Sequence, residues 1–149
     1  MSAVATMIPT ENEQATTELD WMFPTVDCGH MPLGTRVVVQ LRGTKKKSAG
    51  GLILVDETKE TEKWNTQVAK VVLLGSLAYR NRETREFWPE GAWVKIGDFV
   101  RIPRWGGDRW EVMIPGRPKD EPALFVTFND HELISRVTGD PLAIKAFIL

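Results

Sequence analysis

The strongest constraint on the fold of this chain is a series of short β-branched and apolar runs that end at glycine or proline. The run at 35–42 lies between Gly34 and Gly43, and the run at 68–75 ends at Gly75. Three more runs of this kind cover 99–103, 110–114 and 123–128. No helical pattern extends over more than two turns. Short strands separated by such turns in one small domain predict an all-β fold, either a barrel or a sandwich.

Segments rich in glycine and polar residues between these runs predict the turns. Residues 81–84 are expected to form a hairpin tip, and the Gly-Gly pair within 105–110 a turn between two strands. Gly97 and Asp98 form a turn dipeptide, so we expect Asp98 to shape the turn rather than to act as a catalytic acid. Residues 130–137 are expected to form either a short turn that leads into a strand or a short helix.

Length and charge restrict the classes of function. The 149 residues are enough for one domain with arms, and the net charge of −1 argues against a nucleic-acid partner. No apolar run reaches the roughly 18 residues that span a bilayer, so no membrane partner is expected. The single cysteine excludes an internal disulfide framework. A reducing compartment, the cytoplasm, is therefore the expected location.

The two ends of the chain differ from its middle. Residues 1–31 are expected to form an N-terminal arm, because the first 35 residues hold five acids and no lysine or arginine. Within this arm, residues 21–24 are apolar and are expected to dock on another surface. Residues 138–149 are expected to form a C-terminal tail, and its apolar last residues require a partner surface.

The sequence offers little for catalysis or metal binding. Glycine motifs that bind phosphate are absent, which argues against a nucleotide-dependent enzyme. Cys28 and His30 could offer two ligands to zinc, but a four-ligand site needs partners and the chain has no second cysteine. The same pair lacks the oriented third group that a nucleophilic pair requires. We therefore expect no enzymatic activity, no catalytic residue, no metal and no cofactor.

Residues 43–63 form a long polar stretch inside the compact domain. Loops of about 20 residues without secondary structure are uncommon and are usually functional. The stretch is rich in lysine, glycine, threonine and glutamate, yet four large apolar residues lie in its middle at 52–55. One interpretation is a further strand of a barrel, with Gly50 and Gly51 as a bulge. The other is a loop whose apolar residues are buried by a partner.

Five segments carry motifs in a particular order: 32–39, 47–54, 68–75, 94–100 and 133–137. The first is similar to an opening Pro-Leu-x-Asp-Arg-Val strand, and the Gly-Gly and aliphatic tripeptide of the second are similar to a mobile loop. The third resembles a Gly-x-Val-x-x-Val-Gly strand, the fourth a Val-Lys-Val-Gly-Asp-x-Val stretch, and the fifth a closing strand. Over residues 32–137 the chain therefore resembles the GroES family of co-chaperonins.

This resemblance implies a small β-barrel over 32–137, with a mobile loop at 43–63 and a roof hairpin at 76–93. It implies a homo-oligomeric ring of seven subunits that caps a GroEL-type chaperonin and assists ATP-dependent protein folding. Each loop would dock in a hydrophobic groove of the chaperonin. By the same resemblance, the docking residues are Leu52, Ile53 and Leu54, and Gly50 and Gly51 let the loop bend.

The resemblance also implies where neighbouring subunits meet, because the closing strand of one subunit would pair with the opening strand of the next. The residues expected at this contact are Arg36, Val37, Val39, Leu133, Ile134 and Val137.

Several features depart from the plain family pattern. Thr35 replaces the family's aspartate, the segment 75–94 is long, and 114–124 is an insertion with three prolines. With both terminal extensions, these features are more typical of a divergent, phage-encoded co-chaperonin than of a housekeeping bacterial one. The alternative hypothesis is a phage capsid decoration or cement subunit in the virion, whose arms and loop are ordered by neighbouring capsid proteins. Medium-chain dehydrogenases also contain this barrel, but the chain is too short for their dinucleotide domain.

Overall fold

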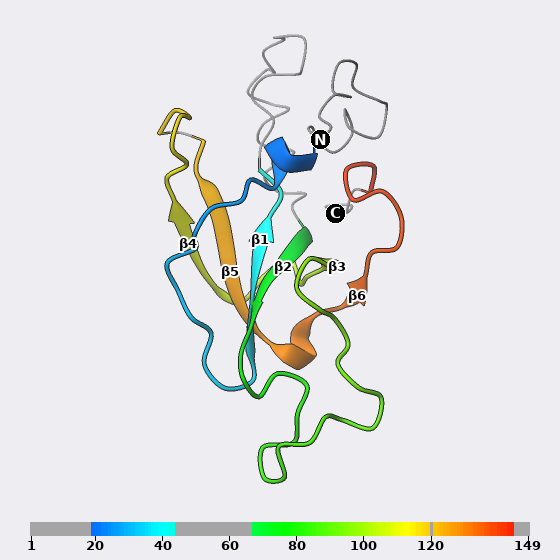
Figure 1. Ribbon diagram of the computed structural model, residues 1–149. Helices are drawn as coiled ribbons and strands as arrows, with labels where there is room; N and C mark the ends of the chain where they lie inside the picture. Colours follow the sequence, from blue (N-terminus) through cyan, green and yellow to red (C-terminus); the bar gives the residue numbers. More distant parts are fainter. Residues whose placement is uncertain (1–18, 44–66, 120, 145–149) are drawn as a thin grey trace, which may run out of the picture.

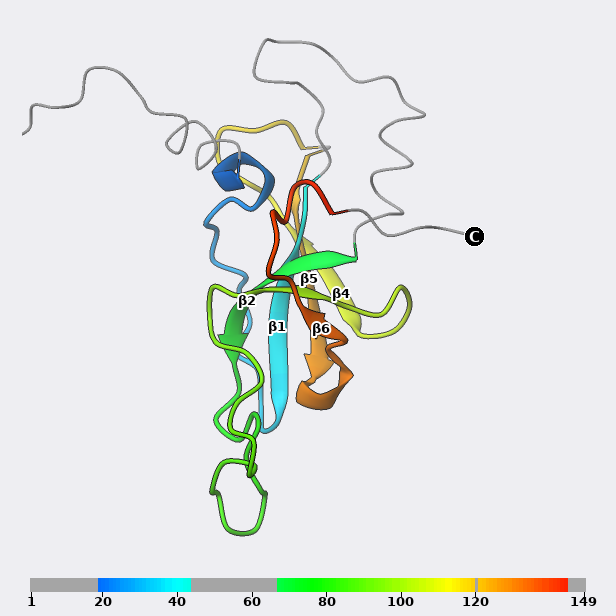
Figure 2. The same ribbon diagram turned by 90° about the vertical axis from the view of Figure 1, so that its right-hand side faces the viewer.

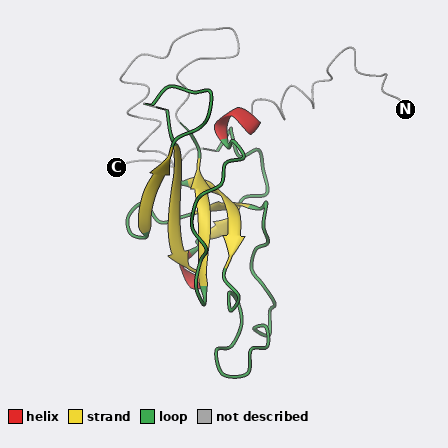
Figure 3. Cartoon of the chain, turned by 60° about the vertical axis from the view of Figure 1, so that its left-hand side comes forward, coloured by secondary structure: helices red, strands yellow, loops and turns green. Residues whose placement is uncertain are grey.

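The computed structural model describes residues 19–43, 67–119 and 121–144, and these form a single antiparallel sheet (Figure 1). Its strands are β1 (Arg36–Leu41), β2 (Val68–Leu74), β3 (Phe99–Arg101), β4 (Asp108–Val112), β5 (Ala123–Asn129) and β6 (Ser135–Arg136). Their order across the sheet is β4-β5-β1-β2-β3-β6. Helix is limited in the described residues to short turns, as Figure 3 shows. The all-β prediction is therefore confirmed.

The central strand β1 is buried on both faces. Val37, Val39 and Leu41 point into the main core, whereas Val38 points to the opposite side of the sheet. The main core contains buried side chains from four strands and from the loops that follow β2, β3 and β5. Besides the three residues of β1, it contains Ala69, Val71, Ala78, Tyr79, Val94, Val100, Ile102, Val126, Phe128 and Leu133. The sheet thus wraps around one core, as the apolar runs predict.

The opposite face of the sheet is covered by the segment that precedes β1. Val26 and Cys28 pack there against Val38 and Phe125. The indole nitrogen of Trp110 on β4 donates a hydrogen bond to the carbonyl of Cys28 at 2.9 Å. The end of the predicted N-terminal arm therefore belongs to the fold, because it shields apolar side chains that the sheet alone would leave in water.

A third apolar cluster lies at the end of the sheet where β1 ends and β2 begins. Met22, Phe23 and Val68 are buried in it, and Phe99 meets the ring of Phe23 edge to face at 5.0 Å. Leu19, Val137, Leu142 and Ile144 are packed around them. The apolar segment 21–24 thus docks, as predicted, and it packs against the chain's own sheet and the start of the C-terminal tail (Figure 2).

The structure corrects the predicted start of one strand and decides between the two alternatives for residues 130–137. β4 begins at Asp108 rather than at Trp110, because the turn is completed earlier, by Gly106 and Gly107 with φ of +96° and +73°. A side chain at position 107 would collide with Val126 and Phe128. Of the two alternatives for 130–137, the first is correct: the 3-10 turn Asp130–Glu132 leads into β6.

Candidate functional site

The predicted docking residues Gly50, Gly51, Leu52, Ile53 and Leu54 lie outside the described residues, as does the alternative of a barrel strand for this segment. The last described residue before the stretch 44–66 is Gly43, and the first one after it is Gln67. Leu41 pairs with Ala69 in the β1–β2 ladder, so both ends of the stretch lie at one end of the sheet. Gln67 is held there by its side-chain amide, which donates to the carbonyl of Ile102 at 3.1 Å.

At the opposite end of the sheet, residues 76–93 project as a turn-rich hairpin (Figure 1). Arg80 and Phe87 form an isolated antiparallel bridge, and the guanidinium of Arg80 lies 3.8 Å from the centroid of the Phe87 ring. The side-chain oxygen of Asn81 accepts hydrogen bonds from the backbone of Glu83 and Thr84, which closes the tip. The hairpin tip predicted at 81–84 is thus confirmed.

Tyr79 anchors this hairpin to the core. It is fully buried, has a φ of +60°, and donates its backbone N–H to the Asp130 carboxylate at 2.8 Å. Its hydroxyl donates to the carbonyl of Asp130 at 3.0 Å. Burial raises the pKa of the Tyr79 hydroxyl, and the nearby Asp130 charge raises it further. Trp88 and Trp93 pack beside the phenol ring, with centroids 5.2 and 5.6 Å away.

The Gly97-Asp98 turn has a structural role, as predicted. The Asp98 carboxylate accepts the backbone N–H of Lys95 at 3.0 Å and its ammonium at 2.9 Å. Partial burial acts to raise the pKa of Asp98, but the hydrogen bonds and charge of Lys95 outweigh it, so that the pKa is lowered. Backbone bonds from Val71 to Asp98 and from Gly97 to Val71 hold the turn against β2.

The six predicted subunit-contact residues divide by exposure. Arg36 and Ile134 are exposed, and Val137 is half-buried in the third cluster. Val37, Val39 and Leu133 are buried in the chain's own main core. Both edges of β1 are hydrogen-bonded within the chain, to β2 and to β5. Both sides of β1 are thus paired within the chain, and the side chains of Arg36 and Ile134 are the ones that are exposed. The pairing between neighbouring subunits stays a prediction.

Cys28 and His30 are engaged in packing. Cys28 is buried, and its thiol lies 3.3 Å from the carbonyl of His30. The imidazole lies over the Trp110 ring at 3.9 Å between centroids, and its Nδ1 donates to the carbonyl of Cys28 at 3.0 Å. Within the described residues no three His, Cys, Asp or Glu side chains gather as metal ligands, and no helix is long and apolar enough to cross a membrane.

Comparison with known proteins identifies the fold. Residues 30–130 match the family model of the chaperonin 10 Kd subunit, which is more than half of the chain. The chain belongs to the chaperonin 10 family. It is 36% identical over 76 residues to the co-chaperonin GroES of Anoxybacillus flavithermus, covering 51% of this chain and 72% of that protein. It is 33% identical over 86 residues to the co-chaperonin GroES of Pelagibacter ubique, covering 58% and 79%. At these identities it is a divergent member.

The family match includes the stretch 44–66 and the hairpin 76–93, and it leaves residues before 30 and after 130 outside. Sequence analysis missed the bond between Tyr79 and Asp130. These residues are 51 positions apart, and neither belongs to a sequence motif that would predict a contact between them. It also missed that the start and the end of the chain pack on each other. Their apolar character was the one available signal.

Proposed function

We propose that this chain is a co-chaperonin that caps a GroEL-type chaperonin and assists ATP-dependent protein folding in the cytoplasm. Leu52, Ile53 and Leu54 dock on the chaperonin, and Gly50 and Gly51 allow the segment to bend toward it. The observation that carries this proposal is the family match, which spans the aliphatic tripeptide. The connection between β1 and β2 that contains this tripeptide leaves and rejoins the sheet at one end, away from the hairpin 76–93.

The energetics favour a contact that forms and releases. Burial of three large aliphatic side chains gives on the order of 5–9 kcal/mol before costs. Each residue that docking orders costs about 1–2 kcal/mol, so ordering the five residues 50–54 alone already offsets most of this gain. A single docking segment therefore binds weakly. Several identical segments on one ring make the later contacts intramolecular, which increases the overall affinity by about 10²–10⁴.

We further propose that the chain works as a ring of seven subunits. Within the described part of the chain, β4 pairs only with β5, and β6 pairs only with β3, so the sheet has two edges that a neighbouring copy could meet. The exposed side chains of Arg36 and Ile134 lie outside the core and serve as the subunit contacts in this proposal. The hairpin 76–93 then forms the roof over the enclosed cavity.

The alternative, a phage capsid decoration subunit, requires arms that reach neighbouring subunits. The described parts of both arms pack on the chain's own sheet instead: Met22 and Phe23 are buried there, and Leu142 and Ile144 are packed against them. No observation on the described residues favours the capsid hypothesis specifically. It would gain support if the chain failed to bind a chaperonin in the tests below.

The docking proposal is tested by Ile53→Asp in the full chain. A carboxylate at this position cannot enter an apolar groove, so binding to a bacterial chaperonin in the presence of ATP or ADP should be lost. The matched control is Ile96→Asp, because Ile96 is 59% exposed on a turn outside the stretch. This control should bind as the parent does. Equal binding by Ile53→Asp and the parent would overturn the proposal.

A further inference from the structure

Two segments that lie outside the family match, 19–24 and 137–144, meet at the base of the proposed docking segment. Residues 19–29 precede the match and 131–144 follow it. The helical turn at 19–22 and the strand-free segment at 138–144 lie at the same end of the sheet, beside the end of β1 and the start of β2 (Figures 1 and 2). Both meet in the third apolar cluster.

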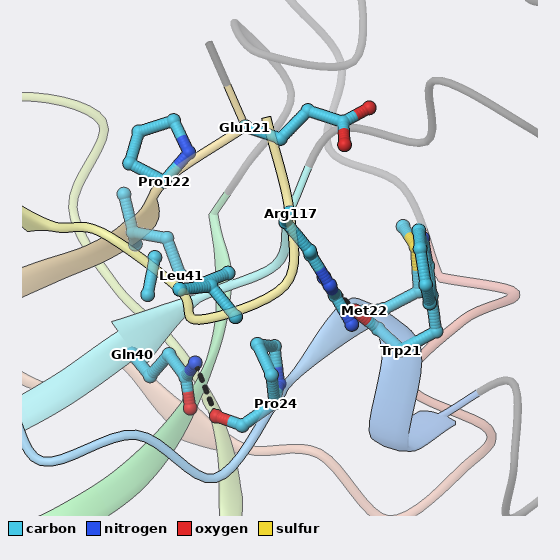
Figure 4. Close-up of a pocket in the computed structure, with 11 residues that line it drawn as sticks. Trp21, Met22, Pro24, Gln40, Leu41, Arg117, Glu121 and Pro122 are labelled. Atoms are coloured by element: carbon cyan, nitrogen blue, oxygen red, sulfur yellow. Dashed lines mark hydrogen bonds between the residues drawn. The ribbon is translucent and has the colours of Figure 1, made fainter. Parts of the chain in front are cut away.

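The N-terminal extension holds the chain where it leaves β1. The backbone N–H of Gly43, the last described residue before the undescribed stretch, donates to the carbonyl of Met22 at 2.8 Å. A Cβ at position 43 would lie 3.3 Å from that carbonyl oxygen, so glycine permits the close approach. Two residues further on, the carbonyl of Pro24 accepts a hydrogen bond from the side chain of Gln40 at 2.8 Å (Figure 4).

The C-terminal extension contacts the chain both where it leaves β1, at Arg42, and where it enters β2, at Val68. Leu142 and Ile144 pack against the cluster that contains Val68, the first residue of β2 after the stretch. The guanidinium of Arg42 donates to the carbonyl of Leu142 at 3.5 Å, and Arg42 is itself buried. A turn closed by bonds from Leu142 and Ala143 to Asp140 fixes the conformation of this extension.

The connection between β4 and β5 also contacts the N-terminal extension. Arg117, in the connection between β4 and β5, lies 3.7 Å from the centroid of the Trp21 ring and donates to the Trp21 carbonyl at 2.9 Å. Figure 4 shows Arg117 reaching toward Trp21 across a small pocket that Met22, Pro24 and Gln40 also line. The pocket holds about 10 Å³, roughly the room of one water molecule, so the contact is closely packed.

We propose that residues 19–24 and 138–144 form a clasp that fixes both ends of the stretch 44–66 and so positions the docking segment for the chaperonin. This inference rests on the proposed function. Met22, Phe23, Leu142 and Ile144 are positioning residues, because they act through Gly43 and Val68. Fixing the ends before docking reduces the conformational entropy that binding must remove, and the gain is repeated in every subunit of a ring.

The test compares the full chain with Leu142→Ala/Ile144→Ala. The matched control is Leu33→Ala/Ile96→Ala, which removes similar side chains from positions that are 68% and 59% exposed. Hydrogen exchange followed by mass spectrometry reports on the peptides that contain Gly43 and Val68, and on the hairpin 76–93 as an internal reference. Binding of the chaperonin with nucleotide is measured on the same samples.

If the clasp fixes these ends, hydrogen exchange in the Gly43 and Val68 peptides of the double variant should become at least fivefold faster. Hydrogen exchange in the hairpin 76–93 should not change. The affinity of the double variant for the chaperonin should fall about tenfold. The control should change none of these. Arg117→Ala removes the guanidinium that contacts Trp21 and that interacts with the charge of Glu121, and should shift the same quantities in the same direction by a smaller factor. It serves as the test if the double variant does not fold.

Two results would overturn the clasp. If exchange at Gly43 and Val68 is unchanged, the extensions do not hold the ends. If exchange becomes faster but affinity stays within twofold of the parent, the extensions are merely structural. Ile53→Asp, measured in parallel, separates these failures from failure of the proposed function. If that variant binds the chaperonin normally, the docking proposal falls and the clasp's role falls with it.

Discussion

The bond between Tyr79 and Asp130 gives the most direct structural prediction. Asp130→Ala removes the carboxylate that accepts the Tyr79 N–H at 2.8 Å and leaves that buried donor without its partner. A hydrogen bond to a charged acceptor contributes about 1.5–3 kcal/mol, and an unsatisfied buried donor costs about 1–3 kcal/mol. These contributions overlap, so we expect a loss of about 2–4 kcal/mol in the free energy of unfolding. Asp130→Asn retains an acceptor oxygen and should lose about 1 kcal/mol.

The assay is urea unfolding followed by tryptophan fluorescence at one fixed protein concentration, because the stability of an oligomer depends on concentration. Trp88 and Trp93 lie beside Tyr79 and report on the hairpin. The matched control is Glu83→Ala, which removes an exposed acid from the tip of the same hairpin and should stay within about 0.5 kcal/mol of the parent. An Asp130→Ala variant as stable as this control would refute the reasoning that the carboxylate anchors the hairpin.

Two other positions give predictions of the same kind. Because the pKa of the Tyr79 hydroxyl is raised on folding, its stabilising effect is complete below the unfolded value of about 10 and is lost as the pH rises above it. The stability difference between the parent and Tyr79→Phe should thus decrease between pH 9 and 11, and a constant difference would contradict the assignment. Gly75→Ala places a Cβ 2.8 Å from the carbonyl oxygen of Arg36 and also against that of Gly34, so it should cost about 3 kcal/mol in urea unfolding. Stability equal to that of the parent would show that the backbone there can shift.

The local pattern of the sequence predicted most of the strands. The run at 35–42 became β1 and the run at 68–75 became β2, because β-branched residues between glycines suit a buried strand with defined ends. The start of β4 was placed two residues late. Asp108 is polar and follows Gly-Gly, so local preference assigned it to the turn, whereas pairing with Thr127 on β5 places it in the strand.

The predictions that stayed open or incomplete concern contacts distant in sequence. Val37 and Val39 were expected at a subunit contact, which stays a prediction; their side chains are buried in the chain's own core, because β1 is an internal strand, and a strand's place in the sheet order cannot be derived from its own residues. The apolar segment 21–24 was expected to dock, and the identity of its surface depended on residues about 120 positions later, Leu142 and Ile144. Periodicity reports which side chains need burial, and it does not report what buries them.

The co-chaperonin proposal is tested most directly by the mass of the purified chain, measured alone and with a bacterial chaperonin in the absence and presence of ADP or ATP. If the chain is a co-chaperonin, it should form a ring of about seven copies that co-elutes with the chaperonin only when nucleotide is present. A monomer or small oligomer that ignores the chaperonin in every nucleotide state would contradict it. Binding of that species to a phage capsid would then favour the decoration-subunit hypothesis.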